Sequence, residues 1–199
     1  LPHTEILTEG DGLVVSAWDI LSGDAVPGEN VLIYDDAGDY AALQAAERIA
    51  ETGARVEIMT RDRNISAEVM AMSLTPSLRE LQKRDVTFTV TWKLDAVRRD
   101  GNRLIAQIGS DYGGVTRERQ VDQVVVNHGT RPLDDLYFDL RDGSTNLGEV
   151  DYAALIAGAP QEVTRNPEGT YQLFRIGDAV AARNTHAAIY DALRLVKAV

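Results

Sequence analysis

The fold is decided by residues 30–60, which read NVLIYDDAGDYAALQAAERIAETGARVEIMT. Residues 31–34 form a short apolar run, which is typical of a buried strand. Residues 41–50 are alanine-rich with an amphipathic pattern, so they predict a helix, which Gly53 would end. Residues 55–59 predict a second strand. This order of strand, helix and strand predicts a βαβ unit of the dinucleotide-binding kind.

The loop between the first strand and the helix has lost its glycines. A dinucleotide-binding loop reads G-x-G-x-x-G, so that backbone amides can approach a pyrophosphate. Here residues 35–41 read DDAGDYA, with Gly38 as the one glycine and carboxylates at Asp35, Asp36 and Asp39. At about 4 Å and an effective dielectric of about 20, each contact between like charges costs on the order of 4 kcal/mol. We therefore expect a nucleotide-binding scaffold with a closed site, in which Tyr34 and Tyr40 fill the space of the nucleotide.

Composition excludes several classes of function. The chain has 199 residues, a formal net charge of −11 and no cysteine. The charge argues against a nucleic-acid partner, and the lack of cysteine excludes disulfides, thiol catalysis and cysteine-ligated clusters within this chain. The three histidines match no zinc spacing, so we predict no metal site. No apolar run approaches the roughly 20 residues of a membrane span, and we expect a cytoplasmic protein without a signal peptide. The start at Leu1 without methionine indicates a piece of something longer, or a processed chain.

Several other segments have the pattern of a strand or a helix. Expected strands lie at 13–17, 86–92, 94–98, 103–108, 121–126 and 173–176, and expected helices at 75–84 and 184–198. Thr75 and Pro76 predict the N-cap and first residue of the earlier helix. Asp100-Gly101-Asn102 predicts a hairpin in an antiparallel layer that covers one face of a parallel sheet. Residues 31–34 should lie centrally in that sheet, beside residues 56–59.

Three motifs carry a resemblance to a known family. They are the entry to the βαβ unit at residues 18–23 (WDILSG), a strand and glycine–proline crossover at 124–132 (VVVNHGTRP), and residues 176–179 (IGDA) before the last helix. In this order they resemble the C-terminal half of the flavoproteins that include trimethylamine dehydrogenase, histamine dehydrogenase and the 2,4-dienoyl-CoA reductase type of NADH:flavin oxidoreductase. The resemblance covers nearly the whole chain.

The resemblance implies an α/β, three-layer Rossmann-like fold with helices, a parallel sheet and an antiparallel β-layer. It implies an NAD-like module at 29–127, inserted in a discontinuous FAD- or ADP-binding-like domain at 1–28 and 128–199. It places an FMN barrel and an iron–sulfur cluster in a part of the protein that this sequence lacks. The altered loop is similar to that of the dehydrogenase branch, whose NAD-like module holds no pyridine nucleotide and whose electrons pass to an electron-transfer flavoprotein.

The resemblance and local chemistry together indicate a partial cofactor site. Asp178 could accept hydrogen bonds from sugar hydroxyls, and Gly177 and Ala179 would allow close approach beside the N-terminus of the last helix. A plain strand-to-helix turn is the alternative. Gly129 forms the crossover, and Arg131 either reaches a phosphate or is simply exposed. No catalytic residue is predicted. For Arg61, Arg63 and His128 we favour surface and crossover roles.

Three hypotheses for function remain open. In the first, the chain is the C-terminal region of a flavin-dependent oxidoreductase that is inactive alone, supports the FMN barrel and holds part of an ADP or FAD site. In the second, it is an active NAD(P)H-binding reductase domain. In the third, it is a structural or docking module without nucleotide. Expected partners are the barrel of the same protein, an electron-transfer flavoprotein and, in a homo-oligomer, further copies of the chain.

Overall fold

The computed structural model describes residues 7–8 and 13–196 of the chain. The chain divides between Gly129 and Thr130 into two compact units, and each is described by itself.

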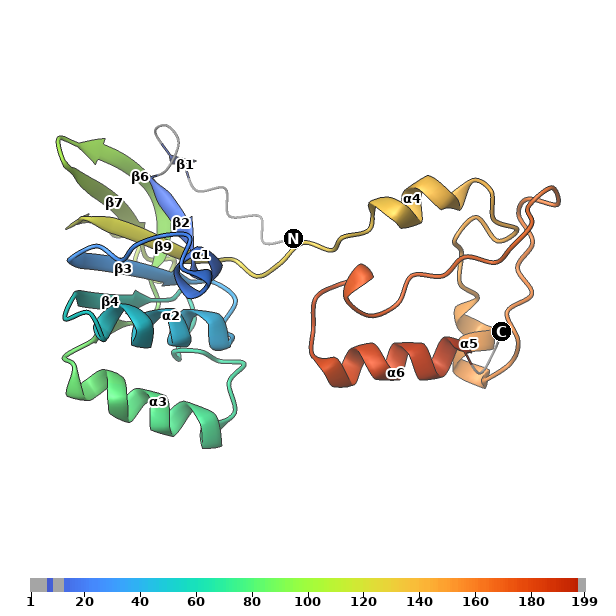
Figure 1. Ribbon diagram of the computed structural model, residues 1–199, viewed down its shortest axis with the longest axis horizontal. Helices are drawn as coiled ribbons and strands as arrows, with labels where there is room; N and C mark the ends of the chain where they lie inside the picture. The colour runs from blue at the N-terminus through green and yellow to red at the C-terminus, as the bar shows by residue number, and fades with distance from the viewer. Residues whose placement is uncertain (1–6, 9–12, 197–199) are drawn as a thin grey trace. The chain divides into compact units, whose positions relative to one another are not determined.

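The first unit is built on a five-stranded parallel sheet (Figure 1). Its strands, in spatial order, are β2 (Val14–Ser16), β9 (Gln123–Asn127), β3 (Asn30–Asp35), β4 (Arg55–Met59) and β5 (Thr87–Thr89). β3 lies centrally and pairs with β4 in parallel, with Val31 opposite Val56. The expected βαβ pairing is thus confirmed.

Three helices cover one face of this sheet (Figure 1). They are α1 (Ala17–Ser22), α2 (Tyr40–Ala50) and α3 (Ala71–Lys83). Side chains alternate along a strand, so Val31 and Ile33 of β3 point toward these helices, where they join a core with Ile49 of α2 and Leu81 of α3. Leu32 and Tyr34 point to the opposite face.

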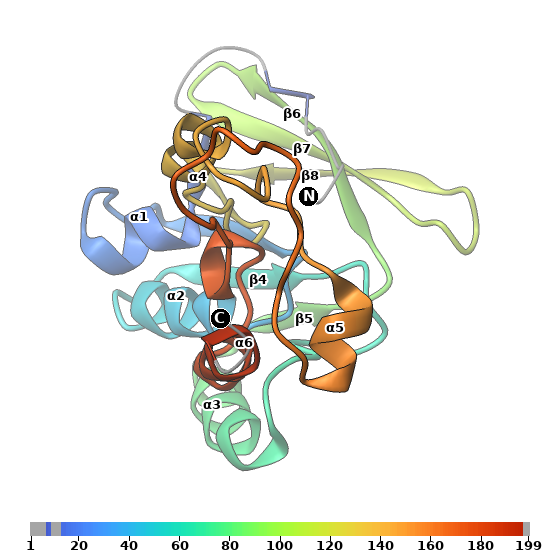
Figure 2. The same ribbon diagram turned by 90° about the vertical axis from the view of Figure 1, so that its right-hand side faces the viewer.

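An antiparallel layer covers that opposite face (Figure 2). It consists of β6 (Lys93–Asp100), β7 (Arg103–Gly109) and β8 (Thr116–Val121), and the short β1 (Leu7–Thr8) pairs in parallel with β6. The expected hairpin joins β6 to β7, with Asp100 opposite Arg103. Leu94, Leu104 and Ile108 pack against Leu32 and Tyr34 in a second core. The three-layer α/β prediction is therefore confirmed.

The second unit contains short helices and loops. Its helices are α4 (Asp135–Arg141), α5 (Tyr152–Ala157), the 3₁₀ turn η1 (Gly177–Ala179) and α6 (Thr185–Val196). Between residues 130 and 196 the structure contains no strand, only an isolated bridge between Ser144 and Tyr171. The strand predicted at 173–176 is wrong, because no neighbouring strand lies there to pair with it. The side chain of Asn146 instead bonds the backbone N–H and C=O of Leu173.

Several boundaries differ from expectation. α3 begins at Ala71 rather than after Thr75, so Pro76 lies inside the helix and the Thr75 hydroxyl donates to the Ala71 carbonyl at 2.8 Å. Leu74 of this earlier turn packs on the helical core, which favours the longer helix. The segment predicted as a strand at 121–126 contains the end of β8, a break at Asp122 and most of β9.

α1 was not predicted as a helix, because residues 18–23 were assigned only as the entry to the βαβ unit. Ser16 and Asp19 form a capping box there: the Asp19 N–H donates to the Ser16 hydroxyl, and the Asp19 carboxylate accepts from the Ser16 N–H at 2.7 Å.

The expected division into domains stays a prediction. The crossover at residue 128 lies close to the unit boundary after Gly129. Residues 14–22, expected in the FAD-like domain, here contribute β2 and α1 to the first unit.

Candidate functional site

The candidate nucleotide site lies at the carboxyl edge of the parallel sheet. β3 and β9 end side by side, with Asp35 opposite Asn127, and the chain leaves β3 through residues 36–39 into α2. In this strand order, β2, which precedes β3 in the chain, and β4, which follows it, lie on opposite sides of β3. Ligands of open α/β sheets bind in a crevice at such a switch point.

A hydrogen-bond network fills this position. The Asn127 side-chain amide donates to Asp35 Oδ1 at 3.0 Å and to Asp39 Oδ1 at 2.9 Å. Asp39 is also the N-cap of α2, where it accepts from the Ala41 N–H at 2.9 Å. One amide group therefore holds together two carboxylates that the sequence alone led us to regard as repelling each other.

Backbone amides of the loop are also occupied. The Gly38 N–H donates to Asp35 Oδ1 at 2.9 Å, and the N–H groups of Asp36 and Ala37 donate to the Asn127 carbonyl at 2.9 and 3.1 Å. A pyrophosphate would need donors of this kind. Here they are bonded to the protein itself.

Gly38 is required by the chain rather than by a ligand. Its φ is +69°, and a Cβ placed on it would lie 3.2 Å from the Ala67 nitrogen. The Gly38 carbonyl accepts from the Glu68 N–H at 2.9 Å. The loop that follows β4 thus packs directly on the position where a dinucleotide loop would receive its phosphates.

Burial shifts the acid–base properties of this site. The Asp35 side chain is buried, and its Oδ2 has no hydrogen-bond partner among the residues that the structure describes. Burial raises the pKa of Asp35 from 3.8 to about 6, although the bonds from Gly38 and Asn127 oppose the shift. The pKa of Tyr34 is raised too, by burial and then by the nearby Asp36, to which its hydroxyl donates at 3.2 Å.

The flanking aromatic residues differ from each other. Tyr34 lies wholly in the second core, whereas Tyr40 is 44% exposed on α2, so the expectation that both fill nucleotide space is wrong for Tyr40.

Arg61 and Arg63, the cations considered for a 2′-phosphate, contact groups of the chain. Arg61 lies 4.0 Å from the Asp36 carboxylate and 3.7 Å from that of Asp111, and Arg63 Nε donates to the Tyr112 hydroxyl at 3.2 Å. Both arginines are exposed. His128 Nδ1 lies 3.7 Å from Asp36 Oδ2, and its ring packs edge-on against Tyr34.

The residues predicted to bind a cofactor do not lie at the N-terminus of the last helix, as expected. Gly177, Asp178 and Ala179 form η1, and α6 begins only at Thr185, so they do not form the start of the terminal helix. Gly177 has a φ of +58°, its N–H donates to Asp191 Oδ2 at 3.2 Å, and its missing Cβ leaves room for Ala188 at 3.2 Å. Asp178 is exposed, and the described residues offer its carboxylate no hydrogen bond.

Gly129 and Arg131 flank the boundary between the units. Gly129 has a φ of +78° and Arg131 is exposed. Within the described residues, no hydrogen bond or ion pair joins Arg131 to Gly177, Asp178 or Ala179. These predicted site residues are therefore not linked to one another by polar contacts.

Among residues 7–8 and 13–196, which the structure describes, no three His, Cys, Asp or Glu side chains gather in a way that could hold a metal ion. No helix among them is long and apolar enough to span a membrane.

Comparison with known sequences identifies relatives much longer than this chain. No protein-family model matches the chain. It is 69% identical over 197 residues to a probable N-methylproline demethylase of Rhizobium meliloti (strain 1021), covering 99% of the chain and 29% of that protein. It is 46% identical over 189 residues to an N,N-dimethylglycine/sarcosine dehydrogenase of Chromohalobacter salexigens, covering 93% of the chain and 27% of that protein. The chain thus spans less than a third of the length of these curated relatives.

Solved structures agree on the fold. Histamine dehydrogenase from Rhizobium sp. 4-9 matches with a TM-score of 0.70 and 20% identity, over 95% of this chain and 26% of that one. The flavoprotein disulfide reductase RclA from Escherichia coli matches with a TM-score of 0.59 and 16% identity, over 96% of this chain and 40% of that one. Over nearly its whole length, the chain therefore resembles one part of the demethylase and dehydrogenase relatives in sequence and one part of histamine dehydrogenase in fold, as its motifs predict.

Proposed function

We propose that the chain is the C-terminal nucleotide-binding-fold region of a flavin-dependent oxidoreductase. In this role it supports an FMN-binding barrel elsewhere in the same protein and contributes part of an ADP or FAD site. The observation that carries the proposal is the 69% identity, over 99% of the chain, to a demethylase of which the chain spans 29%. The fragment alone would be inactive, because no group among its described residues is placed for redox chemistry.

The closed loop favours this role over that of an NAD(P)H-binding reductase domain. Asn127, Asp35 and Asp39 occupy the place of a pyrophosphate, and the loop amides donate to the chain itself. The dehydrogenase role needs no pyridine nucleotide at this site. A docking module without any nucleotide is the third possibility, and the experiment below separates it from the first.

Of the Gly177 N–H and the Asp178 carboxylate in η1, only the carboxylate fits a role in binding ADP or FAD. The Gly177 N–H is bonded to Asp191, so it is not the donor that a phosphate would need. The exposed Asp178 carboxylate fits the role of acceptor for a ribose or ribityl hydroxyl. Arg131 supplies an exposed guanidinium suited to a phosphate. A bound flavin would supply the capacity to accept electrons, and these residues would only hold and orient it.

The names of the relatives suggest a substrate class for the whole protein. N-methylproline, N,N-dimethylglycine and sarcosine are all N-methylated amino acids, and these words stand in the names of the two relatives. We therefore propose an N-methyl amino acid as substrate, an iron–sulfur cluster in the remainder of the protein, and a separate electron-transfer flavoprotein as electron acceptor. A homo-oligomer in the cytoplasm is part of the same proposal.

The test compares two aspartates in the full-length protein. Asp178→Ala should weaken the binding of ADP or FAD by about ten- to a hundred-fold. This is the change in affinity expected from the loss of one charge-assisted hydrogen bond, which contributes about 1.5–3 kcal/mol. Asp39→Ala, at the closed loop, should leave retention nearly unchanged. After bound nucleotide has been removed from each variant, titration with ADP and with FAD measures the dissociation constants. Equal effects of the two substitutions, or the reverse order, would contradict the assignment, and no binding of either ligand would favour the docking module.

A further inference from the structure

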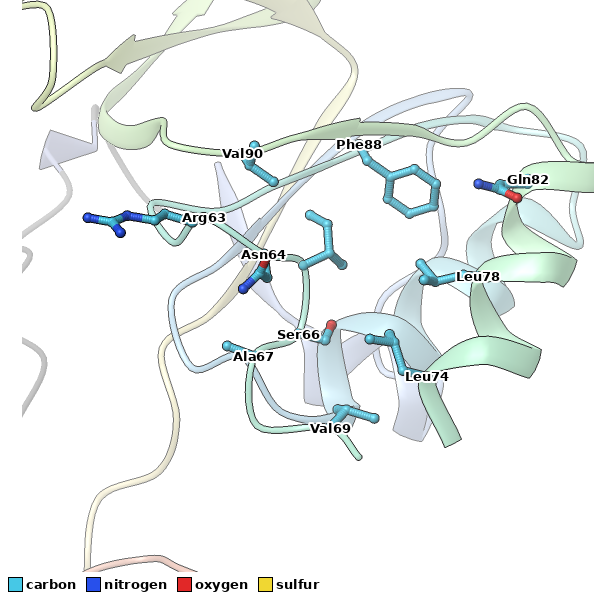
Figure 3. Close-up of a pocket in the computed structure, with 11 residues that line it drawn as sticks. Arg63, Asn64, Ser66, Ala67, Val69, Leu74, Leu78, Gln82, Phe88 and Val90 are labelled. Atoms are coloured by element: carbon cyan, nitrogen blue, oxygen red, sulfur yellow. The ribbon is translucent and has the colours of Figure 1, made fainter. Parts of the chain in front are cut away.

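A cavity of about 520 Å³ lies between α3, β5 and the loop that joins β4 to α3 (Figure 3). Its walls are mainly apolar: Leu74 and Leu78 from α3 face Phe88 and Val90 at the end of β5. This volume is within the range of small-molecule sites, which are mostly apolar with a few placed polar groups.

Ser66 is the buried polar residue of this cavity, which the exposed Asn64 and Gln82 also line. Ser66 is 1% exposed, it lines the cavity, and its hydroxyl has no hydrogen-bond partner within the described part of the chain. A buried hydroxyl without a partner is costly, so such a group requires an explanation. Ser66 also has a φ of +50°, and its carbonyl accepts from the Val69 N–H at 3.0 Å, which holds the residue in this strained conformation. Strained residues cluster at ligand sites.

The cavity is distinct from the closed nucleotide loop. The loop that follows β4 presents the backbone of Ala67 and Glu68 to Gly38, and Ala67 also lines the cavity together with Ile65, Ser66 and Val69. The closed loop is acidic, but no carboxylate from the described residues lines the cavity. A ligand here therefore differs in chemistry from one drawn to the sheet edge.

The lining indicates the charge of the ligand. Arg63 is the charged residue in it, but its side chain points away from the cavity and bonds Tyr112 (Figure 3). Within the cavity there is thus neither a carboxylate for a cation nor an inward guanidinium for an anion. The remaining lining side chains are an aromatic ring, aliphatic groups, the amides of Asn64 and Gln82, and the Ser66 hydroxyl.

We propose that this cavity is a binding site for a small neutral aromatic molecule that carries a carbonyl acceptor. The ring packs between Phe88, Leu74 and Leu78, and the carbonyl oxygen accepts a hydrogen bond from the Ser66 hydroxyl. The site is separate from the proposed ADP or FAD site and does not depend on it.

The first test locates the ligand. Crystals of the full-length protein are soaked with 4-bromobenzamide, and the anomalous signal of bromine is measured. We expect a bromine peak between Leu74, Leu78 and Phe88 with the amide oxygen at Ser66. A cavity without bromine, or one filled by a side chain from another part of the protein, overturns the proposal.

The second test measures the hydrogen bond. Fluorine NMR follows the binding of 4-fluorobenzamide to the wild type and to two serine variants. Ser66→Ala should weaken binding by about three- to ten-fold, the range for one neutral hydrogen bond. Ser73→Ala, at an exposed position on α3, should leave it unchanged. Equal affinities in both variants overturn the role of Ser66.

A third variant tests the cavity independently, in case Ser66→Ala does not fold. Leu74→Trp fills the cavity with a larger apolar side chain and should abolish binding while the thermal unfolding temperature stays the same or rises. Unchanged binding in this variant would place the ligand elsewhere. Benzylamine, a cation of similar size, serves as the ligand control and should bind more weakly than benzamide, because no carboxylate lines the site.

Discussion

Replacing Asp35 with asparagine should change how the stability of the first unit depends on pH. Asp35 is buried, one of its oxygens is unpaired, and burial raises its pKa to about 6. The folded state therefore binds its proton more tightly than the unfolded chain does. The contribution of Asp35 to the free energy of unfolding is fully present below about pH 4 and is lost as the pH rises through about 6.

The magnitude follows from the shift. A rise of about 2 units corresponds to about 3 kcal/mol of stability lost once Asp35 is fully ionised. About half of that loss, roughly 1.4 kcal/mol, falls between about pH 5 and about pH 8. The Asp35→Asn variant carries no titrating group here, so its free energy of unfolding relative to wild type should rise by that amount across the same interval. Any constant cost of the new amide cancels in this comparison.

Urea unfolding followed by tryptophan fluorescence is the measurement. Both tryptophans, Trp18 and Trp92, lie in the first unit, so the signal reports the unit that contains Asp35. Asp62→Asn, at an exposed position, is the matched control and should follow wild type at both pH values. If Asp35→Asn followed wild type as closely as the control does, the burial argument would be refuted.

Three further predictions concern the closed loop. Asn127→Ala should lower the free energy of unfolding by about 2–4 kcal/mol, because two carboxylates lose their shared donor, and the same urea titration measures it. Gly38→Ala should destabilise more than Gly53→Ala by about 1 kcal/mol: both glycines have positive φ, but only Gly38 has a neighbour within 4 Å of its added Cβ, and equal losses would speak against the contact with Ala67. Calorimetry of the chain with NADH and NADPH should show no binding below about millimolar concentration, and a micromolar dissociation constant would favour the reductase role.

The parts of the fold that follow from the sequence are those set by local patterns. The strands on either side of α2 come from apolar runs with strand periodicity, and Gly101 marks the hairpin between β6 and β7. α1 has a local signal too, the pairing of Ser16 with Asp19, which could have identified this six-residue helix. The strand expected at 173–176 shows the limit of such patterns, because a strand needs a neighbour and the second unit provides none within its described residues.

The closure of the site could be predicted, but not its mechanism. The missing glycines and added carboxylates of residues 35–41 indicated that a pyrophosphate would not fit. The central residue of the network, Asn127, lies 92 positions from Asp35, and only the register of β3 against β9 brings the two together. In the sequence, Asn127 stands out only as part of the crossover motif at residues 124–132. Its position at the end of a strand that pairs with β3 is the signal that would have identified it.

The hydrogen bonds from Asn127 to the two aspartates also bear on whether the loop needs a bound ligand to be stable. Proteins that need a ligand to order a loop gain stability only as the ligand concentration exceeds its dissociation constant. Here the N–H groups of residues 36–38 donate to the chain itself, and Asn127 donates to both aspartates. These donors therefore do not need a bound cofactor as their partner, and the stability of the first unit should not vary with the supply of nucleotides.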